Sequence, residues 1–283
     1  MKSAAAFLLS LMAAAPLQAE EIGLCRFDSE TLAFAGTPVE QATCLLQHVG
    51  RSAAVSPQPL PDTLGNLLKS GGKPSPAQRD AALSALPEPY GTYARSVALW
   101  PVSQTADGLP ALYFVIHDTS TPFLGDAPFP ADVDHDPAIN DFTPYVRPQP
   151  VAHFFLNREG QVWAGHDIAE AWRATKLESF VIGLPAKGRF LHVETVQPRR
   201  YAPGSHWLGD TLAPEPGFSA AQYRILAALY VYSSARAGRW LIPAQHATID
   251  SGIPEGHDDP QNFDLARFAA EVDRLGSADK PGS

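Results

Sequence analysis

The sequence predicts an α/β (α+β) fold in which helices flank a central mixed β-sheet. Residues 111–117 (ALYFVIH) form a continuous apolar run, which is typical of an interior strand buried on both faces. Residues 151–157 and 161–165 read as two strands joined by an Arg-Glu-Gly turn, which indicates a β-hairpin. Residues 219–236 begin with a capping box and repeat apolar side chains at helical spacing, so we expect this helix to pack against the sheet.

The composition is that of an ordinary globular protein. The chain has 283 residues, of which 45% are hydrophobic and 18% are charged, with a formal net charge of -9. This length suits one large core with a smaller appended region. The negative charge argues against a role in nucleic-acid binding, which requires a basic surface, and against electrostatic adhesion to anionic membranes.

Residues 1–19 show the features of a secretory signal peptide in the usual order. Lys2 precedes an apolar run from Ala4 to Ala15 that is too short to span a membrane, and the residues before Glu20 suit cleavage. A buried N-terminal helix is the alternative. We therefore predict an exported protein, periplasmic or secreted, that has no transmembrane segment and is a monomer.

Residues 20–95 are expected to form a small helical N-terminal region. Thr37 opens a capping box and a helix that we expect to run to about His48. Ser75 repeats this start signal for a second helix. Proline and glycine are frequent in residues 56–74, so this connection reads as a loop.

The sequence contains two cysteines, Cys25 and Cys44. In an exported protein two such cysteines are expected to pair, and the disulfide would join the first helix to the N-terminus. Ligation of a metal by both sulfurs is the alternative, although the CxxC spacing typical of such sites is absent from the sequence.

Two predicted strands carry polar side chains of the types that catalysis uses. His117 ends the apolar strand, and α/β folds place their sites just beyond such strands. Residues 190–196 (FLHVETV) form another strand, in which alternation puts His192 and Glu194 on the same face. A carboxylate inside an apolar strand needs a partner, so Glu194 is the most informative carboxylate of the chain.

The loop 245–263 (QHATIDSGIPEGHDDPQNF) holds two histidines and three aspartates. Imidazole and carboxylate groups held together suit zinc, but a site needs further groups from elsewhere in the chain. A closing helix is expected at 262–275, where the main domain, 96–275, ends. Residues 276–283 are expected to be a disordered tail.

Four blocks of sequence follow one another in a characteristic order. They are VIHDTS at 115–120, AHFFLNREGQVWAG at 152–165, LHVETV at 191–196, and IPAQH at 242–246 with GHDDP at 256–260. Together they resemble the zinc-dependent N-acetylmuramoyl-L-alanine amidases, the type 2 amidase family related to peptidoglycan-recognition proteins. The resemblance covers about residues 95–275 and implies a type 2 amidase-like fold that binds Zn2+.

The resemblance implies a role for each matching residue. His117, His246 and Asp259 match the three zinc ligands, and Asp258 is the alternative to Asp259. Glu194 matches the acidic residue that acts on the zinc-bound water. His257 stands where many members carry a lysine that helps to stabilise the oxyanion.

The implied activity is hydrolysis of the amide bond between N-acetylmuramic acid and L-alanine in peptidoglycan or a muropeptide. Trp163, Trp172 and Arg173 are candidates for contact with this substrate. The alternatives are a non-catalytic peptidoglycan-binding protein of the same fold, a zinc peptidase acting on stem peptides, and purely structural histidines. The sequence contains no HExxH motif, which argues against the common metalloprotease mechanism.

Overall fold

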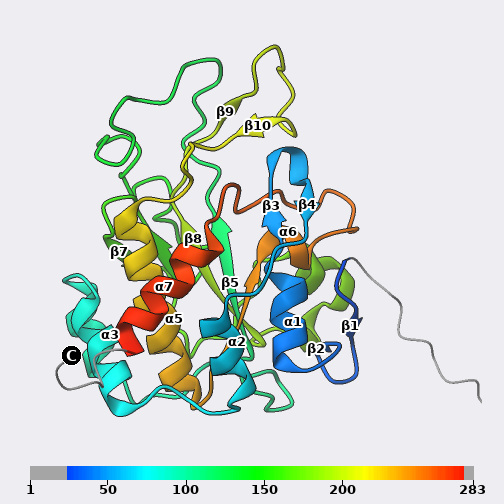
Figure 1. The fold of residues 1–283 in the computed structure, drawn as a ribbon, viewed down its shortest axis with the longest axis vertical. Coiled ribbons are helices and arrows are strands. Elements are labelled where there is room, and N and C mark those ends of the chain that lie inside the picture. The colour runs from blue at the N-terminus through cyan, green and yellow to red at the C-terminus, as the bar shows by residue number, and fades with distance from the viewer. Residues whose placement is uncertain (1–23, 277–283) are drawn as a thin grey trace, which may run out of the picture.

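The computed structural model describes residues 24–276, so the predicted signal peptide and residues 277–283 of the predicted tail lie outside it. A five-stranded sheet in the order β11-β5-β8-β6-β7 forms the centre, and helices flank it (Figure 1). Its strands are β5 (Tyr113–Asp118), β6 (Phe154–Leu156), β7 (Val162–Ala164), β8 (Phe190–Thr195) and β11 (Ile242–Gln245). All pairings are parallel except that of β7 with β6. This mixed sheet confirms the predicted α/β class.

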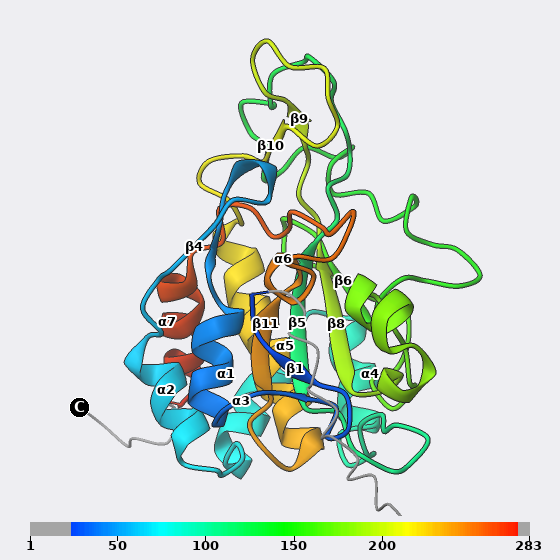
Figure 2. The same ribbon diagram turned by 90° about the vertical axis from the view of Figure 1, so that its right-hand side faces the viewer.

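The other elements that the structure describes follow in chain order. They are β1 (Phe27–Asp28), β2 (Ala33–Phe34), α1 (Pro38–Leu45), β3 (His48–Val49), η1 (Arg51–Ala53), β4 (Val55–Ser56), α2 (Asp62–Lys69), α3 (Pro76–Ala85), α4 (Tyr90–Ser96), the π-helix η2 (Leu177–Ile182), η3 (Leu184–Ala186), β9 (Arg200–Tyr201), β10 (Thr211–Leu212), α5 (Ala220–Ala237), α6 (His246–Ile249) and α7 (Leu265–Gly276). In both ribbon views the β9–β10 hairpin lies at one end of the molecule, beyond the central sheet (Figures 1 and 2).

Strand β5 is an interior strand, as its apolar run predicts. It pairs with β11 on one side and with β8 on the other, and each of its residues is buried. The predicted hairpin is also confirmed, because Phe155 of β6 lies opposite Trp163 of β7. Since β11, β5 and β8 are parallel, their carboxyl ends meet at one edge of the sheet.

One face of the sheet packs against α5. The ring of Tyr230 lies 5.5 Å from the ring of Phe114 in β5. The predicted capping box forms at Ser219, and Gly238 ends the helix in a left-handed conformation, which glycine adopts without steric cost. Helices α3 and α7 pack against α5 in turn, so its buried surface extends well around the helix.

The N-terminal region covers part of the opposite face. Phe34 of β2 contacts Tyr113 at 5.3 Å between ring centroids, and Phe27 of β1 lies 6.4 Å from Phe190. Tyr113 and Phe190 begin the strands β5 and β8 and pair with one another in register. Because side chains alternate along a strand, the carboxyl end of this same face carries the side chains four residues further on.

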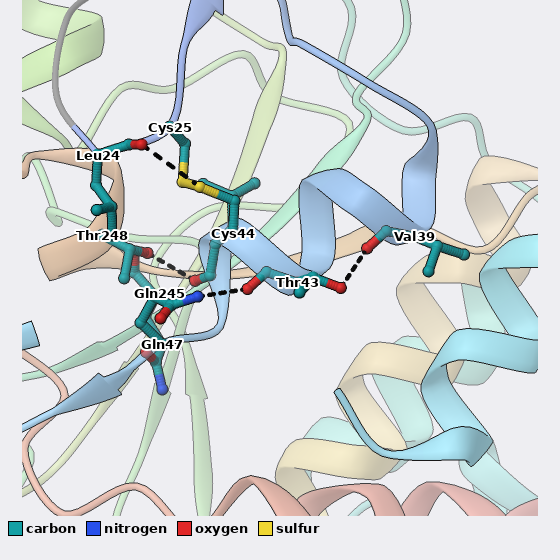
Figure 3. The surroundings of a disulfide bond; sticks show 9 residues. Leu24, Cys25, Val39, Thr43, Cys44, Gln47, Gln245 and Thr248 are labelled. Atoms are coloured by element: carbon teal, nitrogen blue, oxygen red, sulfur yellow. Dashed lines mark hydrogen bonds between the residues drawn. A yellow bond between two sulfur atoms is a disulfide. The ribbon is translucent and has the colours of Figure 1, made fainter. Parts of the chain in front are cut away.

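The predicted disulfide is confirmed and fixes α1 to the start of the described chain. Cys44 of α1 bonds to Cys25, and Figure 3 shows this bridge with Gln245 and Thr248 nearby. The Thr248 hydroxyl donates to the carbonyl oxygen of Leu45 at 2.6 Å. Helix α1 therefore packs directly against β11 and α6. The predicted loop 245–263 is thus partly wrong, because its first residues belong to these two elements and the loop begins only after Ile249.

Three predicted boundaries were wrong. The first helix ends at Leu45 instead of near His48, because Leu46 leaves helical geometry and the chain enters β3. Residues 56–74 are not all loop, since α2 forms there with Leu64 and Leu68 buried one turn apart. The closing helix begins at Leu265, not at 262, because Asn262 has a positive φ of 58°.

Within residues 24–276, the structure has no helix with the length and hydropathy that a membrane crossing requires.

Candidate metal centre

The three strands whose carboxyl ends meet supply most of the candidate site. His117 lies near the end of β5, directly opposite Glu194 of β8. His246 follows β11 and begins the short helix α6. Asp259 comes from the loop after α6, where its carbonyl oxygen accepts the N–H of Ala247 at 2.8 Å. The structure thus brings together residues that are far apart in the sequence.

His117, His246 and Asp259 form a compact, buried group of metal-ligand types. One donor atom from each lies within 4.8 Å of the others. The Nδ1 atoms of the two histidines are 2.8 Å apart, and His246 Nδ1 lies 3.1 Å from Asp259 Oδ1. Glu194 Oε1 lies 3.9 Å from His117 Nδ1, so a carboxylate stands beside the group without belonging to it. Two imidazoles and one carboxylate are ligands that zinc accepts in catalytic sites.

The structure distinguishes the two neighbouring aspartates. Asp259 is buried beside both histidines, and its Oδ2 accepts the backbone N–H of Asp118 at 3.0 Å. Asp258 instead accepts from the Gln261 side chain at 2.7 Å and lies 3.6 Å from Arg199. Of the two, Asp259 is therefore the one placed to act as a ligand.

A buried ion pair between Arg199 and Asp118 contacts the loop that carries Asp259. Arg199 donates to Asp118 Oδ2 at 2.7 Å, and both side chains are almost completely buried. Asp118 also accepts the N–H groups of Ser120 at 2.9 Å and Gln261 at 3.1 Å. Because Asp118 and Gln261 flank Asp259 in space, this pair helps to fix the candidate ligand.

The electrostatic environment of the histidine–aspartate group favours a positive charge. Burial disfavours the cationic form of His246, but Asp259 and Asp250 outweigh this effect and raise its pKa to about 10. Burial lowers the pKa of His117 well below its ordinary value, and the neighbouring His246 adds to the decrease. The carboxylates that favour a proton on His246 would equally favour a divalent cation in its place.

Glu194 occupies an environment that suits proton transfer. Burial raises the pKa of its carboxyl group well above the ordinary value, and the charge of Asp259 raises it further. Its Oε2 is buried and has no hydrogen-bond partner among the described residues. A carboxylate with raised proton affinity and a free oxygen can accept a proton from water and release it again.

A cleft of about 320 Å³ opens onto Glu194 and His246. Trp172, Arg173 and the neighbouring segment line its wall, together with Phe180, whose side chain is 75% exposed. Two of the three substrate-contact candidates therefore lie at the site. The third, Trp163, does not line this cleft. It packs against Phe155 at 5.0 Å between ring centroids.

His257 lies at the entrance to the group. Its side chain is half exposed, and its ring stacks on His246 with 4.2 Å between centroids. Its Nδ1 lies 3.4 Å from Asp259 Oδ1. His257 also lines the cleft, so a substrate there would meet its imidazole ring.

Two further buried groups, His192 and Glu178, lie behind His117, and sequence patterns indicated only the first. His192 Nδ1 lies 3.1 Å from His117 Nε2, and Glu178 of η2 lies 3.2 Å from His192 Nε2. The alternation of β8 already places His192 on the face of Glu194. Nothing in the sequence around Glu178 indicates that its carboxylate is completely buried.

A larger cavity lies elsewhere on the molecule. It has a volume of about 840 Å³ and is lined by residues around the start of α7, including Phe218, Phe263 and Arg267. It includes none of the candidate site residues. Side chains of metal-ligand types and a carboxylate converge instead at the smaller cleft, which is therefore the candidate site.

No family model and no curated protein matches the chain. Among solved structures, the chain is similar to one described as the crystal structure of a selenomethionine derivative of AmpD. The two are 22% identical, with a TM-score of 0.35, and the match covers 60% of this chain and 89% of that chain. Because the identity and the TM-score are low, this similarity carries no argument about function.

Proposed function

We propose that this protein is a zinc-dependent amidohydrolase that cleaves the bond between N-acetylmuramic acid and L-alanine in peptidoglycan or its fragments. One observation carries the proposal. Donor atoms of His117, His246 and Asp259 lie within 4.8 Å of one another, and Glu194 stands next to them at an open cleft. A metal with three protein ligands keeps a free position for catalysis, and the adjacent carboxylate provides the base.

The residues present fit a zinc ion. His117 and His246 would bind it through Nδ1, and Asp259 through a carboxylate oxygen, because these atoms face one another in the buried group. When bound, zinc supplies a Lewis acid that polarises the scissile carbonyl and makes water more acidic. The mixed imidazole and carboxylate set is also typical of catalytic zinc in other hydrolases.

Glu194 is the proposed general base and then the general acid. Its carboxylate accepts a proton from the attacking water and later gives it to the leaving amine nitrogen of L-alanine. His257 is the proposed oxyanion partner, since an imidazole N–H at the cleft can donate to the developing negative charge. Both roles agree with those implied by the matching sequence blocks.

The sequence blocks provide the reason for choosing a muropeptide as the substrate, and the cleft is compatible with that choice. Arg173 and Lys176 line it, although the protein as a whole is acidic. Cationic side chains at this point suit the carboxylates of a stem peptide. The disulfide between Cys25 and Cys44 is typical of an exported protein, and such a protein would meet peptidoglycan outside the cytoplasm.

The test is digestion of purified sacculi and defined muropeptides, with the products identified by mass spectrometry. The zinc-loaded protein should release intact stem peptides that begin with L-alanine. Glu194→Gln should retain one zinc per chain and lose cleavage, whereas Glu159→Gln, an exposed turn residue, should retain both. Cuts within the stem peptide would instead indicate a peptidase. Muropeptide binding without cleavage would indicate a binding protein, and either result would refute the proposal.

A further inference from the structure

Two fully buried polar residues lie behind the proposed metal site and have no part in the proposed mechanism. Glu178 and His192 each have 0% exposure. Burying a carboxylate and an imidazole is unfavourable unless each is well partnered. Both lie close to His117 and can therefore affect the orientation of its ring.

The two residues connect to His117 in a line. His117 Nε2 lies 3.1 Å from His192 Nδ1, and His192 Nε2 lies 3.2 Å from Glu178 Oε2. The other ring nitrogen of His117, Nδ1, faces His246 and Asp259. One nitrogen of His117 thus points to the proposed metal, and the other points to this buried pair.

Glu178 determines where the protons in this line reside. Its Oε2 accepts the N–H groups of Ala174 at 3.2 Å and Thr175 at 3.1 Å, and the Thr175 hydroxyl at 2.9 Å. An oxygen that receives three donors is an acceptor. This acceptor oxygen lies 3.2 Å from His192 Nε2 without forming a hydrogen bond to it. Its negative potential favours hydrogen on that nitrogen, which leaves the lone pair of the ring on Nδ1.

The same rule then applies to His117. The lone pair of His192 Nδ1 faces His117 Nε2, so His117 carries its hydrogen on Nε2. Its Nδ1 then carries a lone pair, which faces His246. We propose that Glu178 and His192 form a positioning relay that holds His117 with Nδ1 directed at the metal. This inference rests on the proposed metal site and adds two residues to it.

The second histidine has a direct counterpart of this arrangement. His246 Nε2 lies 2.9 Å from Asp250 Oδ2, and Asp250 accepts the N–H groups of Lys176 and Leu177, both at 3.0 Å. The four consecutive amides of residues 174–177 thus fix two carboxylates, one behind each histidine. A single backbone segment on the cleft wall therefore orients both proposed histidine ligands.

The variants that test the relay change one link at a time. His192→Phe keeps the ring shape and removes both nitrogens. His192→Gln keeps an acceptor for His117 and a donor for Glu178, so it should restore much of the function. His153→Gln is the matched control, because His153 is an equally buried histidine that stacks on His192 without facing His117.

The measurement is the zinc dissociation constant, obtained by competition with a chromophoric chelator. His192→Phe should bind zinc about 10–100-fold more weakly, the range typical for loss of an outer-shell partner, with His192→Gln in between. His153→Gln should bind like the wild type. Melting temperatures of the zinc-free proteins show whether each variant folds. Equal zinc affinity in folded His192→Phe and wild type would overturn the relay.

A second readout remains available if His192→Phe does not fold. Nitrogen-15 NMR of the wild-type histidine rings, with and without zinc, identifies which nitrogen of His117 carries hydrogen. Hydrogen on Nε2 is expected, and hydrogen on Nδ1 in the zinc-free protein would refute the relay. The two proposals also fail separately. A wild type that binds no zinc refutes the proposed function, whereas zinc binding with the wrong His117 tautomer refutes only the relay.

Discussion

Replacing Arg199 with methionine should destabilise the protein strongly, because it leaves the buried carboxylate of Asp118 without its cation. Both side chains are at most 1% exposed and lie 2.7 Å apart. Breaking a buried ion pair on one side costs about 3–5 kcal/mol. Ser120 and Gln261 still donate to Asp118 after the change, so we expect the lower end, about 3 kcal/mol.

The effect of Arg199→Met is measured by thermal unfolding of the zinc-free protein. For a chain of this size about 3 kcal/mol corresponds to a fall in melting temperature of roughly 6–12 °C. The matched control is Arg200→Met at the next position, where the guanidinium is only partly buried and lies over the ring of Phe129. The control should change the melting temperature by much less.

A double-mutant cycle shows whether the ion pair itself is responsible. Asp118→Asn removes the charge and keeps an acceptor for the neighbouring N–H groups. The double variant with Arg199→Met should lose clearly less free energy of unfolding than the sum of the two single variants. The reason is that it has no buried, unpaired charge at either position. Additive effects, or a melting temperature of Arg199→Met within about 2 °C of the wild type, would refute this account of the pair.

Two further predictions concern stability. Replacing Cys25 and Cys44 with serine should lower the free energy of unfolding by about 3 kcal/mol in urea titrations, because the short loop between them is no longer closed in the unfolded chain. Unchanged stability would mean that packing of α1 suffices without the bridge. Burial lowers the pKa of His153 to about 3, and His192 adds to the decrease. Below about pH 6.5 the imidazole of His153 is therefore protonated in the unfolded chain but stays neutral in the folded protein. The free energy of unfolding consequently falls as the pH drops below that value. His153→Gln should remove about 2 kcal/mol of this loss at pH 5, measured against wild type by urea unfolding at pH 7 and pH 5. Parallel pH curves for the two proteins would contradict the assignment.

The sequence predicted those parts of the fold that local patterns determine. The apolar run of β5, the Arg-Glu-Gly turn and the capping box at Ser219 each act over a few residues, and each element formed as expected. The errors arose where tertiary contacts or unusual backbone geometry decide. Helix α2 forms in a segment rich in helix-breaking residues because Leu64 and Leu68 gain burial, and Asn262 delays α7 through its positive φ.

The candidate site was predictable for a similar reason. His117 and Glu194 lie on parallel strands, and His246 directly follows one, so topology alone brings them to the same edge of the sheet. Glu178 could not be predicted in this way. Its position depends on the π-helix η2, whose geometry has no clear sequence signal, and on backbone donors from the preceding residues.

The candidate site contains three buried aspartates, and their charged partners differ. Asp118 is compensated by Arg199, whereas Asp259 and Asp250 face histidines. Asp259 and Asp250 raise the pKa of His246 to about 10, and burial together with the charge of Asp259 raises the pKa of Glu194 well above its ordinary value. A divalent cation coordinated at the same point would replace the proton on His246 and lower the proton affinity of Glu194. The burial and close spacing of these side chains are unfavourable without a metal. The same burial and spacing would favour binding of a cation next to the carboxylate of Glu194.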